Sequence, residues 1–342
     1  MNNNDWNKVF PEVPQNFHEA VQRTLDTQII NKVGRRKGMK KKFVIVLAAA
    51  IAALSVTTAA AYVFHWNEKL VDRFKVNEDQ QNRLANDGAV ADVNQTVTKN
   101  GVTISAIQTL GDKNGIYILF NIKAPEGITL TKDGSGIGMN VNIEGVPNVS
   151  YSSQWVLDSE KVGSSSKGRG ECYYELWLNN NAGGNWNGKD ITVEFANLRD
   201  LNKGPDNNVT VPGKWELSWK LSYADQMKSV DINKAYTVNG KEIVVKSVEF
   251  SPLSMTFNLG GNGLGQLVAN SDLNEAGGLC SVSLMKRDGS TIDEGARGES
   301  YSGNTYTQDI RFGRVHDLDQ ITGFVLTFYH EAKDNSLTIP LS

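Results

Sequence analysis

The sequence predicts a mainly β protein: a short cytoplasmic amphipathic helix, one transmembrane helix, a juxtamembrane helix and two antiparallel, immunoglobulin-like β-sandwich ectodomains. Three observations predict this fold class. Residues 43–64 form a run of 22 residues without a charge, Asn, Gln, Gly or Pro. After residue 97, apolar and polar residues alternate in short stretches separated by Gly, Asn, Ser and Asp. Asn-Gly pairs at 100–101 and 239–240 indicate two-residue hairpins.

The first predicted element is a helix from Asn16 to about residue 31. Asn16 is a good N-cap, and Glu19 three positions later completes a capping pair. One face of this helix is apolar, with residues repeating every four positions: Phe17, Val21, Leu25 and Ile29. A lone helix of about 16 residues is marginal in water unless its apolar face is covered. Segment 1–42 is therefore predicted to carry a partner-binding helix. The alternative is a helix that lies on the inner leaflet, held by the basic residues after it.

The second predicted element is a membrane-spanning helix over residues 43–64. A helix of this length extends roughly 33 Å, enough to cross a hydrocarbon layer of about 30 Å. The alternative is a secretory signal peptide cleaved near Ala59-Ala60-Ala61. Signal sequences are usually about 15–30 residues long, with an apolar core of about 7–15 residues. Because 42 residues precede this longer apolar run, we expect the span to be retained.

Charge predicts the orientation of this span. Its N-terminal edge is basic, with Arg35, Arg36, Lys37, Lys40, Lys41 and Lys42, and such residues favour the cytoplasmic side. Trp66 fits an aromatic anchor at the outer membrane surface. Residues 1–42 hold nine Lys/Arg and four Asp/Glu, whereas the rest of the chain holds 26 and 34. We therefore expect a single-pass protein of the cell membrane with a cytoplasmic N-terminus and acidic extracellular domains that do not bind nucleic acid.

Residues 65–224 are predicted to form the juxtamembrane helix and the first β-sandwich domain. From His65 to about Leu84, the apolar residues Leu70 and Phe74 stand among charged ones, as in a stalk helix packed on a sheet. Beyond the first hairpin, strands are expected at 116–122, 139–143, 151–157, 171–178, 191–198 and 214–223.

Residues 225–342 are predicted to form the second β-sandwich domain, with the boundary near 224–229. Residues 236–243 resemble residues 97–104, since each stretch reads as a strand, Asn-Gly and a longer strand. Either a duplication or shared hairpin sequence rules explain this likeness. Further strands are expected at 244–250, 255–259, 280–285, 306–312, 324–329 and 337–341. Cys172 and Cys280 could pair across the two domains or remain two buried thiols.

The sequence indicates no catalytic residue, metal or cofactor. Only His316 and His330 could serve an outer active site, and each stands beside an acidic residue that a strand would point to the opposite face. No Ser lies in a Gly-x-Ser-x-Gly elbow, and no Cys/His spacing suits zinc. Most outer Trp residues are expected in sandwich cores. Trp186, in a predicted loop rich in Gly and Asn, is the one expected to be exposed.

The order of these elements resembles a family of Gram-positive bacterial membrane proteins. The likeness is carried by Val13-Pro14-Gln15-Asn16-Phe17-His18 with its helix, the basic run, the Ala-rich span and the Asn-Gly sandwiches. The outer part of that family is known only as a domain of unknown function, and its members are commonly described as negative regulators of extracytoplasmic-function sigma factors. The resemblance implies an anti-sigma role, in which segment 1–42 holds a cytoplasmic sigma factor and the outer domains sense.

Two functions are therefore considered. The first is an anti-sigma-factor-like regulator that couples an outer sensor for an unknown extracellular ligand to a cytoplasmic sigma factor. The second is a cell-surface binding or adhesion module that contacts a wall polymer or a protein, with the N-terminus only an anchor. Deletion of residues 2–31 should change transcription under the first hypothesis and leave it unchanged under the second.

Overall fold

A computed structural model describes residues 64–131, 133–156, 170–180, 183–204, 208–269, 279–293, 295–328 and 336–341. The chain divides into two compact units, Met1–Tyr62 and Val63–Ser342, and every described residue belongs to the second unit. The predicted inner helix and residues 43–63 of the predicted span lie outside the described residues. Within the described ranges, no helix combines the length and hydrophobicity needed to cross a membrane.

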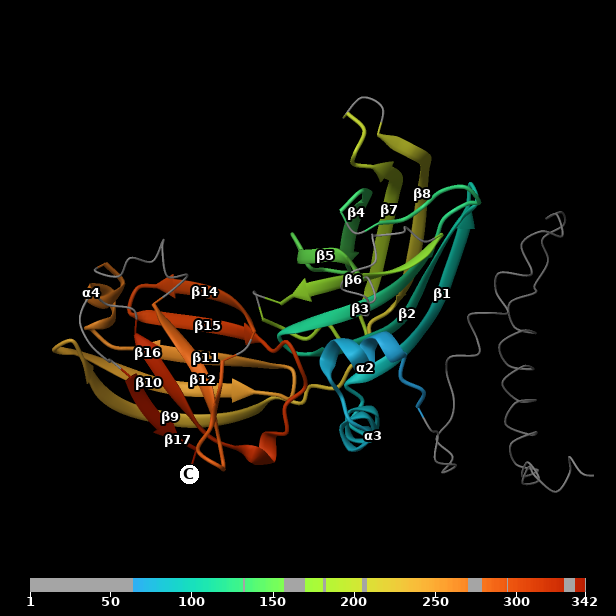
Figure 1. Cartoon of the computed structure of the whole chain (residues 1–342). Helices are drawn as coiled ribbons and strands as arrows, with labels where there is room; N and C mark the ends of the chain where they lie inside the picture. Colours follow the sequence, from blue (N-terminus) through green and yellow to red (C-terminus); the bar gives the residue numbers. More distant parts are fainter. Residues whose placement is uncertain are drawn as a thin grey trace, which may run out of the picture. The chain divides into compact units, whose positions relative to one another are not determined.

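Antiparallel sheets make up most of the described chain, as predicted, and Figure 1 shows how their strands are arranged. The first half has a five-stranded sheet in the order β1-β2-β3-β6-β5 and a three-stranded sheet in the order β4-β7-β8. Residues of both sheets share one core that includes Ile104, Phe120, Phe195 and Trp215. We call this half the first sandwich. Its strands are β1 (Val90–Lys99), β2 (Val102–Asp112), β3 (Gly115–Lys123), β4 (Ser135–Ile143), β5 (Ser150–Val156), β6 (Glu171–Asn179), β7 (Asp190–Asp200) and β8 (Val209–Lys220).

The second half is built in the same manner, and we call it the second sandwich. Its sheets have the orders β14-β15-β11-β10-β9 and β13-β12-β16-β17, and they share a core that includes Phe257, Tyr306 and Phe324. The strands are β9 (Lys228–Val238), β10 (Lys241–Phe250), β11 (Ser254–Gly260), β12 (Cys280–Lys286), β13 (Thr291–Ile292), β14 (Ala296–Ser302), β15 (Thr305–Arg311), β16 (Ile321–Phe328) and β17 (Ser336–Pro340). A short helix, α4 (Leu264–Ala269), and a 3₁₀ turn, η4 (Leu318–Gln320), lie between strands.

The two Asn-Gly hairpins are confirmed. Asn100 and Gly101 have φ of 52° and 76°, and Asn239 and Gly240 have φ of 49° and 71°. Positive φ at both central residues gives a type I′ turn, whose twist matches the paired strands. Each hairpin also has a bulge in its first strand, with a left-handed Asn at position 94 or 233, six residues before the turn. Together with the equal strand order, the bulges extend the likeness seen in the sequence to whole sheets.

The prediction of one continuous helix over residues 65–84 was wrong, because the chain forms two short helices there. Helix α2 (Glu68–Phe74) ends at Lys75, whose φ of 52° is left-handed. Helix α3 (Glu78–Asn86) starts with a capping box between Asn77 and Gln80. In this box the Gln80 N–H donates to Asn77 Oδ1 at 2.9 Å, and the Asn77 N–H donates to Gln80 Oε1 at 3.1 Å. These caps satisfy helix-end groups and so favour a break over a continuous helix.

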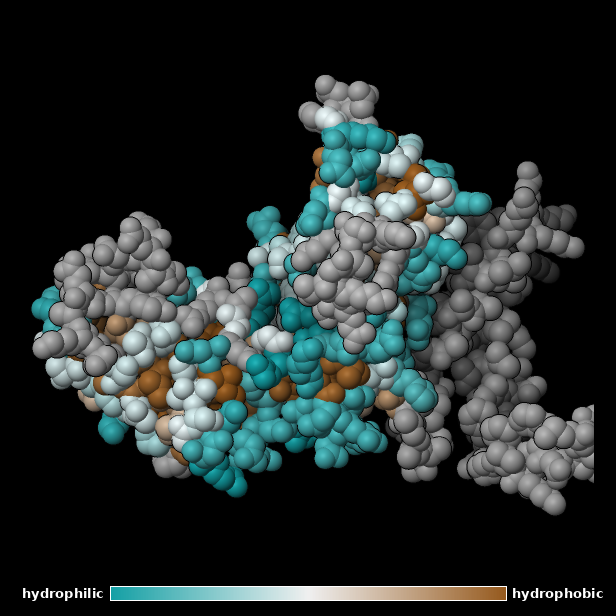
Figure 2. Space-filling model, viewed as in Figure 1, coloured by the Kyte–Doolittle hydropathy of each residue, from teal (hydrophilic) through white to brown (hydrophobic). Residues whose placement is uncertain are grey.

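A third apolar cluster lies under these helices. Leu70, Phe74 and Leu84 are fully buried there together with Leu119 of β3. Leu253 and Val315 of the second sandwich belong to the same cluster. Outside the cluster, the side of α3 seen in Figure 2 is mostly hydrophilic. The segment that follows the predicted span is therefore part of the folded core.

The remaining differences from the sequence prediction are small. Strands β13 and β14 and helix α4 were not predicted. Cys172 and Cys280 are both buried, one in the core of each sandwich, and they do not form a disulfide with one another, as the second of the two alternatives has it.

Candidate functional site

Most of the sequence-predicted site residues lie outside the described part of the chain. This holds for Phe17, Val21, Leu25 and Ile29, and for Arg35, Arg36, Lys37, Lys40, Lys41 and Lys42. Trp66 is described and half-buried beside the helices. Its indole Nε1–H donates to the Gln81 carbonyl at 3.2 Å, and its ring meets Phe64 edge to face at 6.1 Å. The role of Trp66 as a membrane anchor stays a prediction.

The prediction that Trp186 is exposed was wrong. Its side chain is only 4% exposed and packs in the core of the first sandwich. The Trp186 N–H donates to the Tyr223 hydroxyl at 2.9 Å. Gly183 and Gly184 have φ of 69° and 97°, a conformation that other residues rarely adopt, and this lets the loop turn back over the core. Trp186 is therefore a core residue and offers no surface for a polymer.

A buried amide of the first sandwich holds the start of α2. Gln108 on β2 is 2% exposed. Its Oε1 accepts from the Asn67 N–H at 2.8 Å, and its Nε2 donates to the His65 carbonyl at 2.7 Å. A buried side chain that satisfies two backbone groups fixes the position of that backbone, because leaving either group unpaired costs about 1–3 kcal/mol. The residues next to the predicted span are thus tied to β2.

A buried carboxylate holds the end of α2. Glu175 on β6 is 1% exposed and accepts from the Arg73 Nε at 3.2 Å, from the Tyr117 hydroxyl at 2.9 Å and from Gln154. Burial and the neighbouring carboxylate raise the pKa of Tyr117, so this hydroxyl stays protonated and donates. Next to them, the Phe74 ring meets the Tyr117 ring edge to face at 5.0 Å.

The second sandwich also contacts α2 and α3, through hydrogen bonds and an ion pair. The Val315 N–H donates to the Phe74 carbonyl at 3.0 Å, and Arg73 Nη1 donates to the Gly313 carbonyl at 3.3 Å. Arg83 of α3 forms an ion pair with Asp317. These contacts join residues more than 200 positions apart, so no local sequence pattern could have indicated them.

Two turns, one from each sandwich, meet at a buried carboxylate. Asp112, at the end of β2, accepts from the Ser251 hydroxyl and from the Ser254 hydroxyl at 2.6 Å. Burial raises the pKa of Asp112, although these hydrogen bonds act in the opposite direction. Beside it, Lys113 pairs with Glu249.

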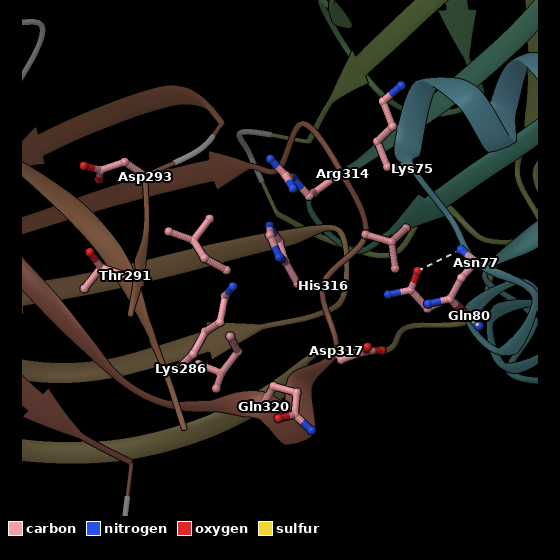
Figure 3. Close-up of a pocket in the computed structure, with 13 residues that line it drawn as sticks. Lys75, Asn77, Gln80, Lys286, Thr291, Asp293, Arg314, His316, Asp317 and Gln320 are labelled. Carbon is pink, nitrogen blue, oxygen red and sulfur yellow. Dashed lines mark hydrogen bonds between the residues drawn. The ribbon is translucent and has the colours of Figure 1, made fainter. Parts of the chain in front are cut away.

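A hollow of about 530 Å³ lies where the α2–α3 connection meets the second sandwich. Figure 3 shows Lys286, Arg314 and His316 around it, with Lys75 and Asn77 coming from the helices. His316 is 5% exposed and meets Phe312 edge to face at 4.8 Å. The full lining is Lys75, Asn77, Gln80, Lys286, Thr291, Ile292, Asp293, Arg314, Val315, His316, Asp317, Gln320 and Ile321.

The charged side chains that line this hollow are three cations, Lys75, Lys286 and Arg314, and two carboxylates, Asp293 and Asp317. Sequence reasoning selected His316 as one of two outer histidines but missed Lys75, Lys286 and Arg314, because nothing in the local sequence marks them. His330, the other histidine, lies outside the described residues. In the described ranges, no three His, Cys, Asp or Glu residues gather in a way that could hold a metal ion.

Comparison with known proteins gives three findings. Residues 35–124 match DUF4179, a domain of unknown function. Among solved structures, the crystal structure of the conserved domain protein from Bacillus anthracis is similar, with 12% sequence identity and a TM-score of 0.49. That comparison covers 74% of this chain and 92% of the other. No curated protein matched the chain.

Proposed function

We propose that this chain is a single-pass membrane regulator of the anti-sigma-factor type. Segment 1–42 would bind a cytoplasmic sigma factor, residues 43–64 would cross the membrane, and two immunoglobulin-like domains divided near residue 224 would sense outside. The observation that carries the proposal is the extent of the DUF4179 match, residues 35–124. It starts in the basic run, crosses the apolar stretch and ends at β3, so it joins the predicted span and the first strands in one family unit. This favours a retained span over a cleaved leader.

The contacts of α2 and α3 support signal transfer. A sensor must pass a change in its outer part to the residues at its span. Here the segment directly after the predicted span is bound to β2 through Gln108, to β6 through Glu175 and to the second sandwich through Val315. A displacement of the second sandwich would therefore pull on α2 and on the residues that lead to the membrane. A free stalk would transmit no such change.

The cytoplasmic half of the proposal is tested by capture of a sigma factor. The full chain in detergent should retain a sigma factor from the host lysate, identified by mass spectrometry. Phe17→Asp combined with Leu25→Asp places two charges on the apolar helix face and should abolish retention. A matched control, Arg23→Gln with Thr27→Asp, changes the net charge by the same amount on the opposite face and should retain it. Equal retention by both double variants would remove the partner-binding helix from the proposal.

The alternative is a surface adhesion module, but the residue expected to make its main contact does not lie on the surface. Trp186 was the aromatic side chain expected to touch a polymer, and it is buried. Deletion of residues 2–31 still separates the two functions. A changed transcript profile with normal surface display supports the regulator, whereas an unchanged profile supports the module.

A further inference from the structure

The hollow beside α2 and α3 is basic, whereas the outer part of the chain is acidic. Beyond residue 42 the sequence holds 26 Lys/Arg and 34 Asp/Glu. Around the hollow, three cationic side chains, Lys75, Lys286 and Arg314, stand against two carboxylates, Asp293 and Asp317, and Asp317 is paired with Arg83 outside the hollow. A concave cationic surface attracts anions by raising their local concentration. On an acidic protein, such a patch is best explained by a ligand.

We propose that this hollow binds the phosphate group of a small organic phosphate. This proposal goes beyond the regulator function and does not depend on it, because it concerns binding to the outer residues alone. The phosphate would lie between Lys286 and Arg314, with Lys75 at the edge of the hollow. The ligand would thereby contact both the second sandwich and the connection between the two helices.

The partners of the charged side chains support an anionic ligand. Within the described residues, neither the Lys75 nor the Lys286 amino group has a carboxylate within ion-pair distance. The two carboxylates of the hollow already have partners. Asp317 pairs with Arg83, and Asp293 accepts from the Ser283 hydroxyl at 2.6 Å. The lysine amino groups are thus available to an added anion.

The types of donor favour phosphate. Lys supplies a compact point charge, and Arg supplies a planar fork that matches two phosphate oxygens. The size and walls of the hollow favour an organic phosphate over the inorganic ion. Its volume of about 530 Å³ lies in the range typical of small-molecule sites, about 300–1,000 Å³. Three aliphatic side chains, Ile292, Val315 and Ile321, also line it and would contact a carbon skeleton.

Such a ligand could come from solution or from the membrane. Helix α2 begins at Glu68, four residues after the end of the predicted span, so a phospholipid headgroup is one source. A free organic phosphate is the other. Both present a phosphate group, a diester in the lipid and a monoester in a free molecule such as glycerol phosphate, and the experiment has one arm for each.

The first arm titrates sn-glycerol 3-phosphate into the full chain in an uncharged detergent, followed by calorimetry. We expect saturable binding that weakens about tenfold in Lys286→Gln and in Arg314→Gln, since each variant removes a charge-assisted hydrogen bond. Lys228→Gln removes the same charge from an exposed position on β9 and should bind as the wild type does. Circular dichroism confirms that each variant is folded.

The second arm places the full chain in nanodiscs made of phosphatidylcholine with or without phosphatidylglycerol. Acetylation of Lys75 and Lys286 is quantified by mass spectrometry, with Lys228 as the internal reference. Protection of both lysines by phosphatidylglycerol assigns the phosphate to the lipid, whereas saturable glycerol phosphate binding assigns it to a free molecule. Either result supports the proposal. Absence of both, or an equal loss of binding in Lys228→Gln, overturns it.

Discussion

The five-stranded sheets of the two sandwiches have the same strand order but differ in what covers them. Asn94, Asn100 and Asp112 of the first sandwich correspond to Asn233, Asn239 and Ser251 of the second, each 139 positions later. Gln108 and Ser247 are also 139 positions apart. Leu119 lies opposite Gln108 and Asn258 lies opposite Ser247, so Leu119 and Asn258 occupy equivalent positions on the next strand. The shared bulge and hairpin show that the same backbone is built twice. What differs is the face turned away from the core.

On the first sandwich that outer face is mainly apolar, with Gln108 and Glu175 among its buried polar residues. Tyr117, Leu119 and Trp177 occupy it and pack under α2. The corresponding residues of the second sandwich are Thr256, Asn258 and Asp309, all polar. Strand β3 is consequently buried on both faces, whereas burial alternates along most of β11. Side-chain composition on one face thus decides which sandwich receives the juxtamembrane helices.

The largest expected effect comes from truncating equivalent positions on the two outer faces to Ala. Leu119→Ala removes a fully buried side chain and should lower the free energy of unfolding by about 3 kcal/mol. Asn258→Ala removes a hydrogen bond to Ser247 on a half-buried face and should lower it by about 1 kcal/mol. Urea titration of the full chain in detergent measures both. Equal losses would contradict the difference between the faces.

The next effect concerns Glu175 of the first sandwich. The equivalent residue of the second sandwich is Thr307, which has no carboxylate. Arg73→Ala leaves the Glu175 carboxylate buried without its cation and should lower the free energy of unfolding by about 2 kcal/mol. In a Glu175→Gln background the same change should cost less than half as much, because no buried charge remains. A double-mutant cycle by urea titration gives the coupling, and a value near zero would exclude a structural role for the pair.

A pH-dependent effect is expected at Asp112, whose counterpart Ser251 cannot ionise. Burial raises the pKa of Asp112 above its usual 3.8, so the folded state keeps this proton to higher pH than the unfolded state does. This contribution to the free energy of unfolding is greatest at low pH and falls as pH rises from about 4 through the folded-state pKa. Asp112→Asn removes the contribution, so its stability relative to the wild type should improve as pH rises.

Asp288 serves as the control for that experiment, because its pKa is shifted in the opposite direction to that of Asp112. Hydrogen bonds from Ser290 lower the pKa of Asp288, which lies in an exposed turn of the second sandwich. Its contribution is present above the unfolded-state pKa and is lost as pH falls, so Asp288→Asn should not reproduce the trend of Asp112→Asn. Thermal unfolding of both variants from pH 4 to pH 8 measures the two slopes, and parallel slopes would be the contrary outcome.

The smallest effect is expected at the solvent-exposed link between α3 and the second sandwich. Arg83 and Asp317 form an ion pair in which both side chains are more than one-third exposed, at 42% and 38%. Such pairs contribute about 0–1 kcal/mol and weaken with salt. Arg83→Gln should therefore lower the unfolding free energy by under about 1 kcal/mol in dilute buffer and change it little in 1 M salt. A larger, salt-independent loss of unfolding free energy would indicate that this ion pair is a main contact between α3 and the second sandwich.

Much of the β structure could be predicted because its signals are local. Alternating residues such as Val102, Ile104 and Ala106 define a strand within a few positions, and Asn-Gly fixes a hairpin by its backbone preference. The continuous apolar run of β3, residues 116–120, also held the information that both of its faces are buried. The second helix was missed because spacing shows an apolar stripe but not the cap at Asn77. Trp186 was misplaced because its Gly-rich surroundings are typical of loops, and a loop can fold back over a core.

The sequence by itself determined most of the strands, the two Asn-Gly hairpins and the division of charge around the apolar stretch. These depend on backbone preferences and residue periodicity, which act over a few neighbouring positions. The tertiary structure alone decided that α2 and α3 are held by both sandwiches and that Lys75, Lys286, Arg314 and His316 surround one hollow. These features join residues that lie 41 to 240 positions apart, and their geometry exists only once both sandwiches have packed against the helices.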